Sequence, residues 1–195
     1  MSIARLDLQR TLVAVIAALD EAGVAHAFIG ALAVLAWGRE RATTAIDLVV
    51  ATADGWQALA DALGRRGIVQ RRQIGPVNQA DTLPDEAIFF TSTSSPVRVD
   101  VFIAKSDFER AVVATAREAD VLGAMARLAA PEASIIYKLL VQRPRDVEDI
   151  DAIFVTRAAA AGELDWRFLN TWAEAWGIAD RLAPYAERFY PRRRG

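Results

Sequence analysis

Two acidic residues stand inside otherwise apolar segments whose residue types favour β-strands. Asp47 lies in AIDLVVA, residues 45–51, and Asp100 lies in RVDVFIA, residues 98–104. A buried carboxylate is costly unless it is paired, hydrogen-bonded or bound to a metal. Two such strands indicate carboxylates that meet at one place, and oxygen ligands of this kind suit Mg²⁺ or Mn²⁺ together with substrate phosphates. The alternative is that each aspartate sits near a strand end, where it caps a loop or pairs with a nearby arginine.

The hydrophobic pattern predicts the elements that position these carboxylates. It predicts a helix over 3–22, a short strand over 24–30 that ends in glycine, and a small helix over 31–38 closed by Gly38. The strand that carries Asp47 follows at 45–51. Between the two aspartates it predicts a helix over 55–67, a possible strand over 68–74, a loop over 75–86 and a further strand over 87–93. The Asp100 strand should pair antiparallel with the strand before it, because only the short turn SSP separates the two.

The rest of the chain is predicted to be mainly helical. Ser106 is a suitable N-cap and Glu109 completes a capping box for a helix over 106–118. A last strand is possible at 124–129, and helical patterns follow at 131–142, 145–162, 164–177 and 179–189. We therefore expect an α/β core over 1–125 and a C-terminal helical region over 126–195, packed on the core.

Composition narrows the class of protein. Of the 195 residues, 53% are hydrophobic, so we expect a sizeable core. The net charge of −2 predicts no general attraction to nucleic acid or membrane. The absence of cysteine excludes disulfides and cysteine metal sites. Asp7 and Arg10 interrupt the first ten residues, unlike a signal peptide, and no apolar run approaches the roughly 20 residues that cross a bilayer. We expect a cytoplasmic protein without a membrane partner.

Four short motifs, in order, resemble the nucleotidyltransferase superfamily of polymerase-β type. They are the glycine step in IGALAVLAWG, the strand entry RERATTAID, the later VDVF, and IIYKLLVQRPRDVEDIDAI, where a lysine precedes acidic residues. Within that superfamily the chain is most similar to AbiEii-type toxins. Its segment LDWRFLNTWAEAWGI resembles the helix that closes those domains. The resemblance covers roughly residues 24–178. It implies an α+β fold, with a small mixed or antiparallel sheet flanked by helices and a C-terminal helical part.

The resemblance also assigns roles near the strands. Asp47 matches the second metal-binding aspartate, and Asp100 matches the third, which binds metal and activates the acceptor hydroxyl. Gly30 and Ala31 match the glycine step, where backbone amides approach the nucleotide's phosphates at a helix N-terminus. Ala31 stands where the family has a second glycine or a serine, so any hydroxyl contact is lost.

Further nucleotide-binding positions follow from the same resemblance. Arg41 and Thr43 match an arginine–threonine pair that contacts phosphate or supports the strand entry. Lys138 matches the lysine that contacts the nucleotide's phosphates. Asp146 and Asp149 match acidic positions that orient this lysine or its helix.

One departure concerns the metal site. Ala45 occupies the place of the first metal-binding aspartate, on the same strand face as Asp47. Asp47 and Asp100 alone could still hold one Mg²⁺ together with nucleotide phosphates. Three explanations stay open: a natural enzyme with a reduced site, a protein that binds nucleotide without transfer, or a mutation that disables a toxic enzyme.

The resemblance therefore implies transfer of a nucleoside monophosphate from an NTP to a hydroxyl acceptor, with Asp47, Asp100 and Lys138 as the catalytic residues. The acceptor is expected on tRNA or other RNA, on a protein or on a small molecule, and a toxin of this type would have a cognate antitoxin as partner. The alternative is a catalytically impaired module that binds nucleotide or RNA.

Other conspicuous residues favour structural roles. His26, the only histidine, is expected to be a packed neutral imidazole. The tryptophans of the last third are spaced for helix packing more than for base stacking. The arginine groups at 65–66, 71–72 and 192–194 could contact RNA phosphate, but solvated arginine is the simpler interpretation.

Overall fold

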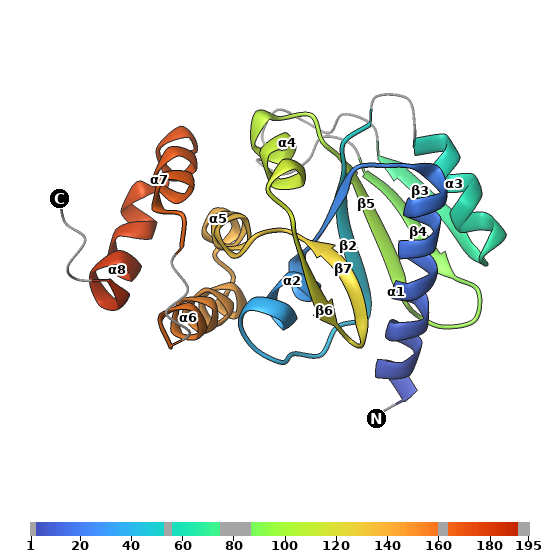
Figure 1. Ribbon diagram of the computed structural model, residues 1–195, viewed down its shortest axis with the longest axis horizontal. Coiled ribbons are helices and arrows are strands. Elements are labelled where there is room, and N and C mark those ends of the chain that lie inside the picture. Colours follow the sequence, from blue (N-terminus) through green and yellow to red (C-terminus); the bar gives the residue numbers. More distant parts are fainter. Residues whose placement is uncertain (1–2, 53–55, 75–86, 160–163, 191–195) are drawn as a thin grey trace. The chain divides into compact units, whose positions relative to one another are not determined.

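The computed structural model describes residues 3–52, 56–74, 87–159 and 164–190 (Figure 1). The chain forms two compact units. The first comprises residues 1–32 and 42–129 and contains the β-sheet; the second comprises residues 33–41 and 130–195 and is helical. The predicted loop at 75–86 and the arginines at 192–194 lie outside the described residues.

The first unit is built on a mixed sheet of seven strands in the order β3-β4-β5-β2-β1-β7-β6. In chain order these strands are β1 (His26–Ile29), β2 (Ala45–Val50), β3 (Ile68–Ile74), β4 (Ala87–Ser92), β5 (Arg98–Ile103), β6 (Arg117–Val121) and β7 (Ala124–Leu128). The pairs β2–β5 and β1–β7 are parallel, and the other four pairs are antiparallel. This confirms the predicted α+β class, its mixed sheet and the antiparallel pairing of β4 with β5.

The strand sequences explain how the sheet is covered. In β5 the side chains of Val99, Val101 and Ile103 are buried, whereas Arg98, Asp100 and Phe102 between them are exposed or half-buried. Successive strand residues point to opposite faces, so β5 presents one apolar face and one partly polar face. In β2 every residue except the half-buried Asp47 is buried.

Three helices complete the first unit. α1 (Ile3–Ala22) contacts β2 and β7, α3 (Trp56–Arg65) contacts β3, and these two helices lie side by side (Figure 1). Arg65 and Arg66 both pair with Glu21 of α1, which gives this arginine pair a structural role. α4 (Asp107–Ala114) begins at Ser106 and has the predicted capping box with Glu109.

The predicted helix over 106–118 is too long. α4 ends at Ala114, and Arg117–Val121 forms strand β6 instead. Leu122 and Gly123 connect β6 to β7 with φ angles of 58° and 79°. Two-residue hairpin turns of type I′ need positive φ at both positions, and they suit the twist of the flanking strands. The hairpin pairing with β7 therefore outweighs the helical pattern of this segment.

In its described residues, the second unit contains the end of one helix and four complete helices. α2 (Gly30–Trp37) begins in the first unit and ends in the second; α5 (Pro131–Val141), α6 (Pro144–Ala159), α7 (Trp166–Ala175) and α8 (Ala179–Phe189) follow. Phe154 of α6 is fully buried and stacks on Trp166, Tyr185 and Phe189. Within the described residues, no helix is long and apolar enough to cross a membrane.

Candidate functional site

Parallel pairing of β2 with β5 places the two strand aspartates side by side. Asp47 and Asp100 are register partners, and Ile29 at the end of β1 is the partner of Asp47 on its other side. Neighbouring strands lie about 4.8 Å apart, and paired residues point to the same face. The carboxylates therefore share one face of the sheet, as required for a common ligand.

Gly30 brings the start of helix α2 up to the Asp47 carboxylate. Its φ of +62° is a left-handed conformation that favours glycine, and a Cβ atom placed on it would lie 2.5 Å from Oδ2 of Asp47. Only a residue without a side chain allows this approach. Ala31, the next residue, is buried. Helix N-termini attract anions, so negative charge is favoured here, whether it is the Asp47 carboxylate or a ligand phosphate.

Asp100 lies in an environment that disfavours its charge. Burial raises the pKa of Asp100, and the nearby charge of Arg98 lowers it only in part, so the pKa lies above its usual value. Within the described part of the chain, the carboxylate of Asp100 accepts no hydrogen bond and forms no ion pair. A strained carboxylate of this kind beside a second one is typical of a binding or catalytic position.

Ala45 and Thr43 mark the entrance of β2. Ala45 is 9% exposed and is the register partner of Arg98 on β5. The Thr43 hydroxyl oxygen lies 3.2 Å from the Ala45 amide, which donates to it, and 3.1 Å from the Ala45 carbonyl oxygen. The Thr43 hydroxyl is therefore bonded to the backbone at the start of β2.

These residues fit one divalent cation better than two. Mg²⁺ is usually bound by one or two carboxylates, with water and substrate phosphates completing its shell. Asp47 and Asp100 meet that requirement. A third carboxylate to bridge a second ion is missing from this face, and no cluster of three or more His, Cys, Asp or Glu suited to a metal occurs among the described residues.

The remaining predicted site residues belong to the second unit, where they form a buried ion network. The ammonium of Lys138, a residue only 7% exposed, lies 3.2 Å from Oδ1 of Asp146 and 2.8 Å from Oδ2 of Asp149. Arg41 donates to Oδ2 of Asp149 at 2.6 Å, and Arg39 donates to its Oδ1 at 2.9 Å. Lys138 therefore shares its charge with two carboxylates, and a phosphate would have to compete with them.

The basic residues set the protonation of this network. Burial raises the pKa of Asp149, but hydrogen bonds from Lys138 and Arg39 and the charges of Lys138 and Arg41 outweigh it, and the pKa lies below its usual value. Asp146 behaves in the same way: burial is opposed by Arg143 and Lys138, and its pKa is lowered. Both carboxylates stay charged at neutral pH.

Two basic residues that the sequence interpretation overlooked stand out. Arg39 pairs with Asp149 and with Glu148, the latter at 2.7 Å. Arg98 lies next to Ala45 and on the face of Asp100. The sequence could have indicated Arg98, because Arg98 and Asp100 are two residues apart in the same strand and such residues share a face. No local signal connects Arg39 to Asp149, which lies 110 residues later.

His26 and the tryptophans have the structural settings expected for them. His26 is buried, with Nδ1 2.9 Å from the Val24 carbonyl oxygen, and burial lowers its pKa despite that hydrogen bond. Trp166 stacks on Phe154 with ring centroids 6.1 Å apart and meets the edge of Tyr190. Neither residue is needed to explain a ligand site.

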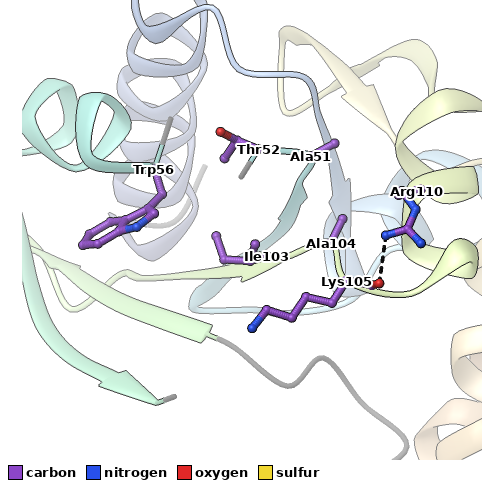
Figure 2. A pocket seen from close by; sticks show the side chains of 7 residues that line it. All are labelled: Ala51, Thr52, Trp56, Ile103, Ala104, Lys105 and Arg110. Atoms are coloured by element: carbon purple, nitrogen blue, oxygen red, sulfur yellow. Dashed lines mark hydrogen bonds between the residues drawn. The ribbon is translucent and has the colours of Figure 1, made fainter. Parts of the chain in front are cut away.

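A cavity of about 670 Å³ lies elsewhere in the first unit. Figure 2 shows the lining side chains, which come from the carboxyl ends of β2 and β5, the start of α3 and α4: Ala51, Thr52, Trp56, Ile103, Ala104, Lys105 and Arg110. Arg110 donates to the Lys105 carbonyl oxygen at 2.8 Å. None of the predicted site residues lines this cavity.

Several solved structures are similar to this chain in fold, among them a nucleotidyltransferase-like protein and an antibiotic-resistance factor. The solution structure of the antibiotic-resistance factor ANT(2'')-Ia has a TM-score of 0.60 at 15% identity, covering 96% of this chain and 99% of that one. A crystal structure of ANT(2'')-Ia with adenylyl-2''-tobramycin gives 0.57 at 16% identity, covering 87% and 99%. An antigenic nucleotidyltransferase-like protein from Paracoccidioides brasiliensis gives 0.52 at 17% identity, covering 94% and 97%.

The chain therefore has the nucleotidyltransferase fold. Its sequence matches no protein-family model and no curated protein. At these low identities the likeness establishes the fold alone.

Proposed function

We propose that this protein transfers a nucleoside monophosphate from an NTP to a hydroxyl acceptor, with release of pyrophosphate. The observation that carries the proposal is the pairing of Asp47 with Asp100 beside the start of α2, where Gly30 leaves room for the Asp47 carboxylate. Carboxylates that can hold Mg²⁺ and a helix N-terminus that favours phosphate are the parts this chemistry needs.

The chain's own residues have distinct roles in this proposal. Asp47 and Asp100 would hold one Mg²⁺, which neutralises charge on the phosphates when it is bound. Asp100, with its raised pKa, is suited to accept a proton from the acceptor hydroxyl. The amides at Gly30 and Ala31 would bind phosphate oxygens. The sequence resemblance also assigns Lys138, Arg41, Asp146 and Asp149 to nucleotide binding.

A second candidate is a module that binds nucleotide without transferring it. Ala45 favours this candidate, because a methyl group stands on the face of Asp47 and Asp100 where a third carboxylate would bridge two ions. Such a protein binds NTP and releases no pyrophosphate with any acceptor.

The two candidates are separated by incubating wild type, Asp47→Asn and Ala45→Asp with labelled NTPs, Mg²⁺ and an acceptor panel. The panel contains total tRNA, protein, and aminoglycosides such as tobramycin, because ANT(2'')-Ia was crystallised with an adenylylated form. Transfer of label by wild type, reduced at least a hundredfold in Asp47→Asn, is the expected result. Asp61→Asn on α3, an exposed position, is the matched control and should keep full activity.

The other outcomes of this experiment are equally informative. Label transferred only by Ala45→Asp identifies a site that has lost activity. NTP binding without transfer by any variant favours the binding module. Activity that is the same in Asp47→Asn as in wild type contradicts the assigned site.

A toxin role is a finer proposal that rests on the sequence resemblance to AbiEii-type proteins. Expression in a bacterial host would then stop growth, and Asp47→Asn would relieve the arrest. Growth arrest that persists in Asp47→Asn would argue against toxicity through nucleotide transfer, and a co-encoded antitoxin would be the partner to seek.

A further inference from the structure

Arg98 occupies a position on β5 directly opposite Ala45. The register pairs Arg98 with Ala45, and the next residues on the same face, Asp100 and Asp47, are also partners. With strands about 4.8 Å apart, the side chain of Arg98 leaves the sheet beside the methyl group of Ala45. The methyl group leaves space for it, whereas a carboxylate at position 45 would pair with it.

The guanidinium of Arg98 is available for a ligand. Arg98 is exposed, and its guanidinium has no hydrogen bond or ion pair with the described residues. Its charge nevertheless reaches the face of the aspartates, because it opposes the effect of burial on the pKa of Asp100. A guanidinium presents a planar set of N–H donors that matches phosphate oxygens in a bidentate arrangement.

The charge of this face suits direct phosphate binding. The two carboxylates and the guanidinium carry a formal net charge of −1, and a third carboxylate at position 45 would make it −2. A polyphosphate cannot approach three carboxylates without divalent cations between them. Here the guanidinium supplies, within the protein, part of the positive charge that cations would otherwise bring.

We propose that Arg98 binds the phosphates of the nucleotide directly and that Asp47 and Asp100 hold at most one divalent cation. This inference rests on the proposed function in one respect, because it takes the ligand to be the NTP of that reaction. Arg98 is then a substrate-binding residue that compensates for the missing third carboxylate.

The test is calorimetric titration of inorganic tripolyphosphate and of ATP, each with Mg²⁺ and with EDTA. The variants are Arg98→Gln, Arg98→Lys and the control Arg71→Gln, an exposed arginine of β3 two strands from β5. Wild type should keep measurable affinity for tripolyphosphate in EDTA. Arg98→Gln should weaken that affinity at least tenfold, Arg98→Lys by less, and Arg71→Gln by no more than about twofold, in line with an exposed charge. Circular dichroism and thermal melting verify that each variant is folded.

Failure of this inference and failure of the proposed function give different results. Equal binding by wild type and Arg98→Gln, equal losses in Arg98→Gln and Arg71→Gln, or binding abolished by EDTA would overturn the role of Arg98. In each case ATP binding in Mg²⁺ could still support the proposed function. Tripolyphosphate binding that depends on Arg98, without ATP binding, supports Arg98 and overturns the nucleotide as ligand. If neither tripolyphosphate nor ATP binds, both the role of Arg98 and the proposed function are overturned.

Discussion

At the scale of single residues, the candidate site combines a backbone conformation that favours glycine with a carboxylate whose charge is disfavoured by burial. Gly30 has a left-handed backbone close to the Asp47 carboxylate, and the half-buried carboxylate of Asp100 has no hydrogen bond from the described residues. Carboxylates with perturbed pKa values are concentrated at functional sites. Both features adjoin or belong to the register pair formed by Asp47 and Asp100.

Asp100→Asn should therefore stabilise the protein at neutral pH. Because the pKa of Asp100 is raised in the folded state, its charge costs stability once the pH rises through that pKa. We expect the substitution to raise Tm at pH 7, and the gain to disappear below pH of about 3.9, the unfolded-state value. Thermal melting across pH measures this, with Asp61→Asn as control. A lower Tm at pH 7 would mean that Asp100 is stabilised as an anion.

At the scale of elements, helices α5 and α6 are joined by charge as well as by apolar packing. Lys138 of α5 pairs with Asp146 and Asp149 of α6, and Asp149 also holds Arg39 and Arg41 of the segment after α2. A buried carboxylate with three basic partners fixes their positions. Removing Asp149 leaves Arg41 without its ion-pair partner among the described residues and Lys138 with Asp146 alone, which is costlier than losing a surface pair.

Asp149→Asn should destabilise the protein by about 3 kcal/mol, the usual loss when a buried ion pair is broken. Urea unfolding at pH 7 measures it. Asp151→Asn on the same helix is the control, because Asp151 forms an exposed pair with Arg188 and should cost no more than about 1 kcal/mol.

The pH dependence gives an independent check of the same assignment. The pKa of Asp149 is lowered in the folded state, so its contribution is present above the unfolded value of about 3.9 and is lost as the pH falls toward the folded pKa. The difference between wild type and Asp149→Asn should shrink in that range. Equal effects of Asp149→Asn and Asp151→Asn would show that the network adds little stability.

At the scale of the whole molecule, the chain passes between its two units at three points. Residues 33–41 belong to the second unit although they lie between two segments of the first. They carry Arg39 and Arg41 to Asp149, more than 100 residues further along the chain. A cut after residue 129 would thus remove the partner of both arginines, and the two units are not independent pieces of sequence.

A nucleotide that binds the folded protein should raise its melting temperature. A ligand at 100 times its Kd adds about 2.7 kcal/mol, which corresponds to roughly 5–10 °C for a chain of this length. We expect such a rise with ATP and Mg²⁺, a smaller rise in Asp47→Asn, and none with adenosine, because the phosphates carry the interaction. A thermal shift assay measures it, and an equal shift with adenosine would place recognition in the base and ribose.

The sequence by itself determined the parts whose cause is local. The capping box at Ser106 and Glu109, the glycine step at Gly30 and the two strands with single aspartates follow from nearby residue types. The extent of α4 was predicted wrongly, because the turn at Leu122 and Gly123 and the pairing of β6 with β7 prevail over a helical pattern.

Only the tertiary structure decided which residues meet. Asp47 and Asp100 are 53 positions apart in the numbering, and their pairing depends on β2 and β5 lying parallel with one particular register. A shift by a single residue would place one of them on the opposite face. The same register sets Arg98 beside Ala45, and the folding of the second unit sets Lys138 between two aspartates. These contacts join distant segments, and no local pattern in the chain records them.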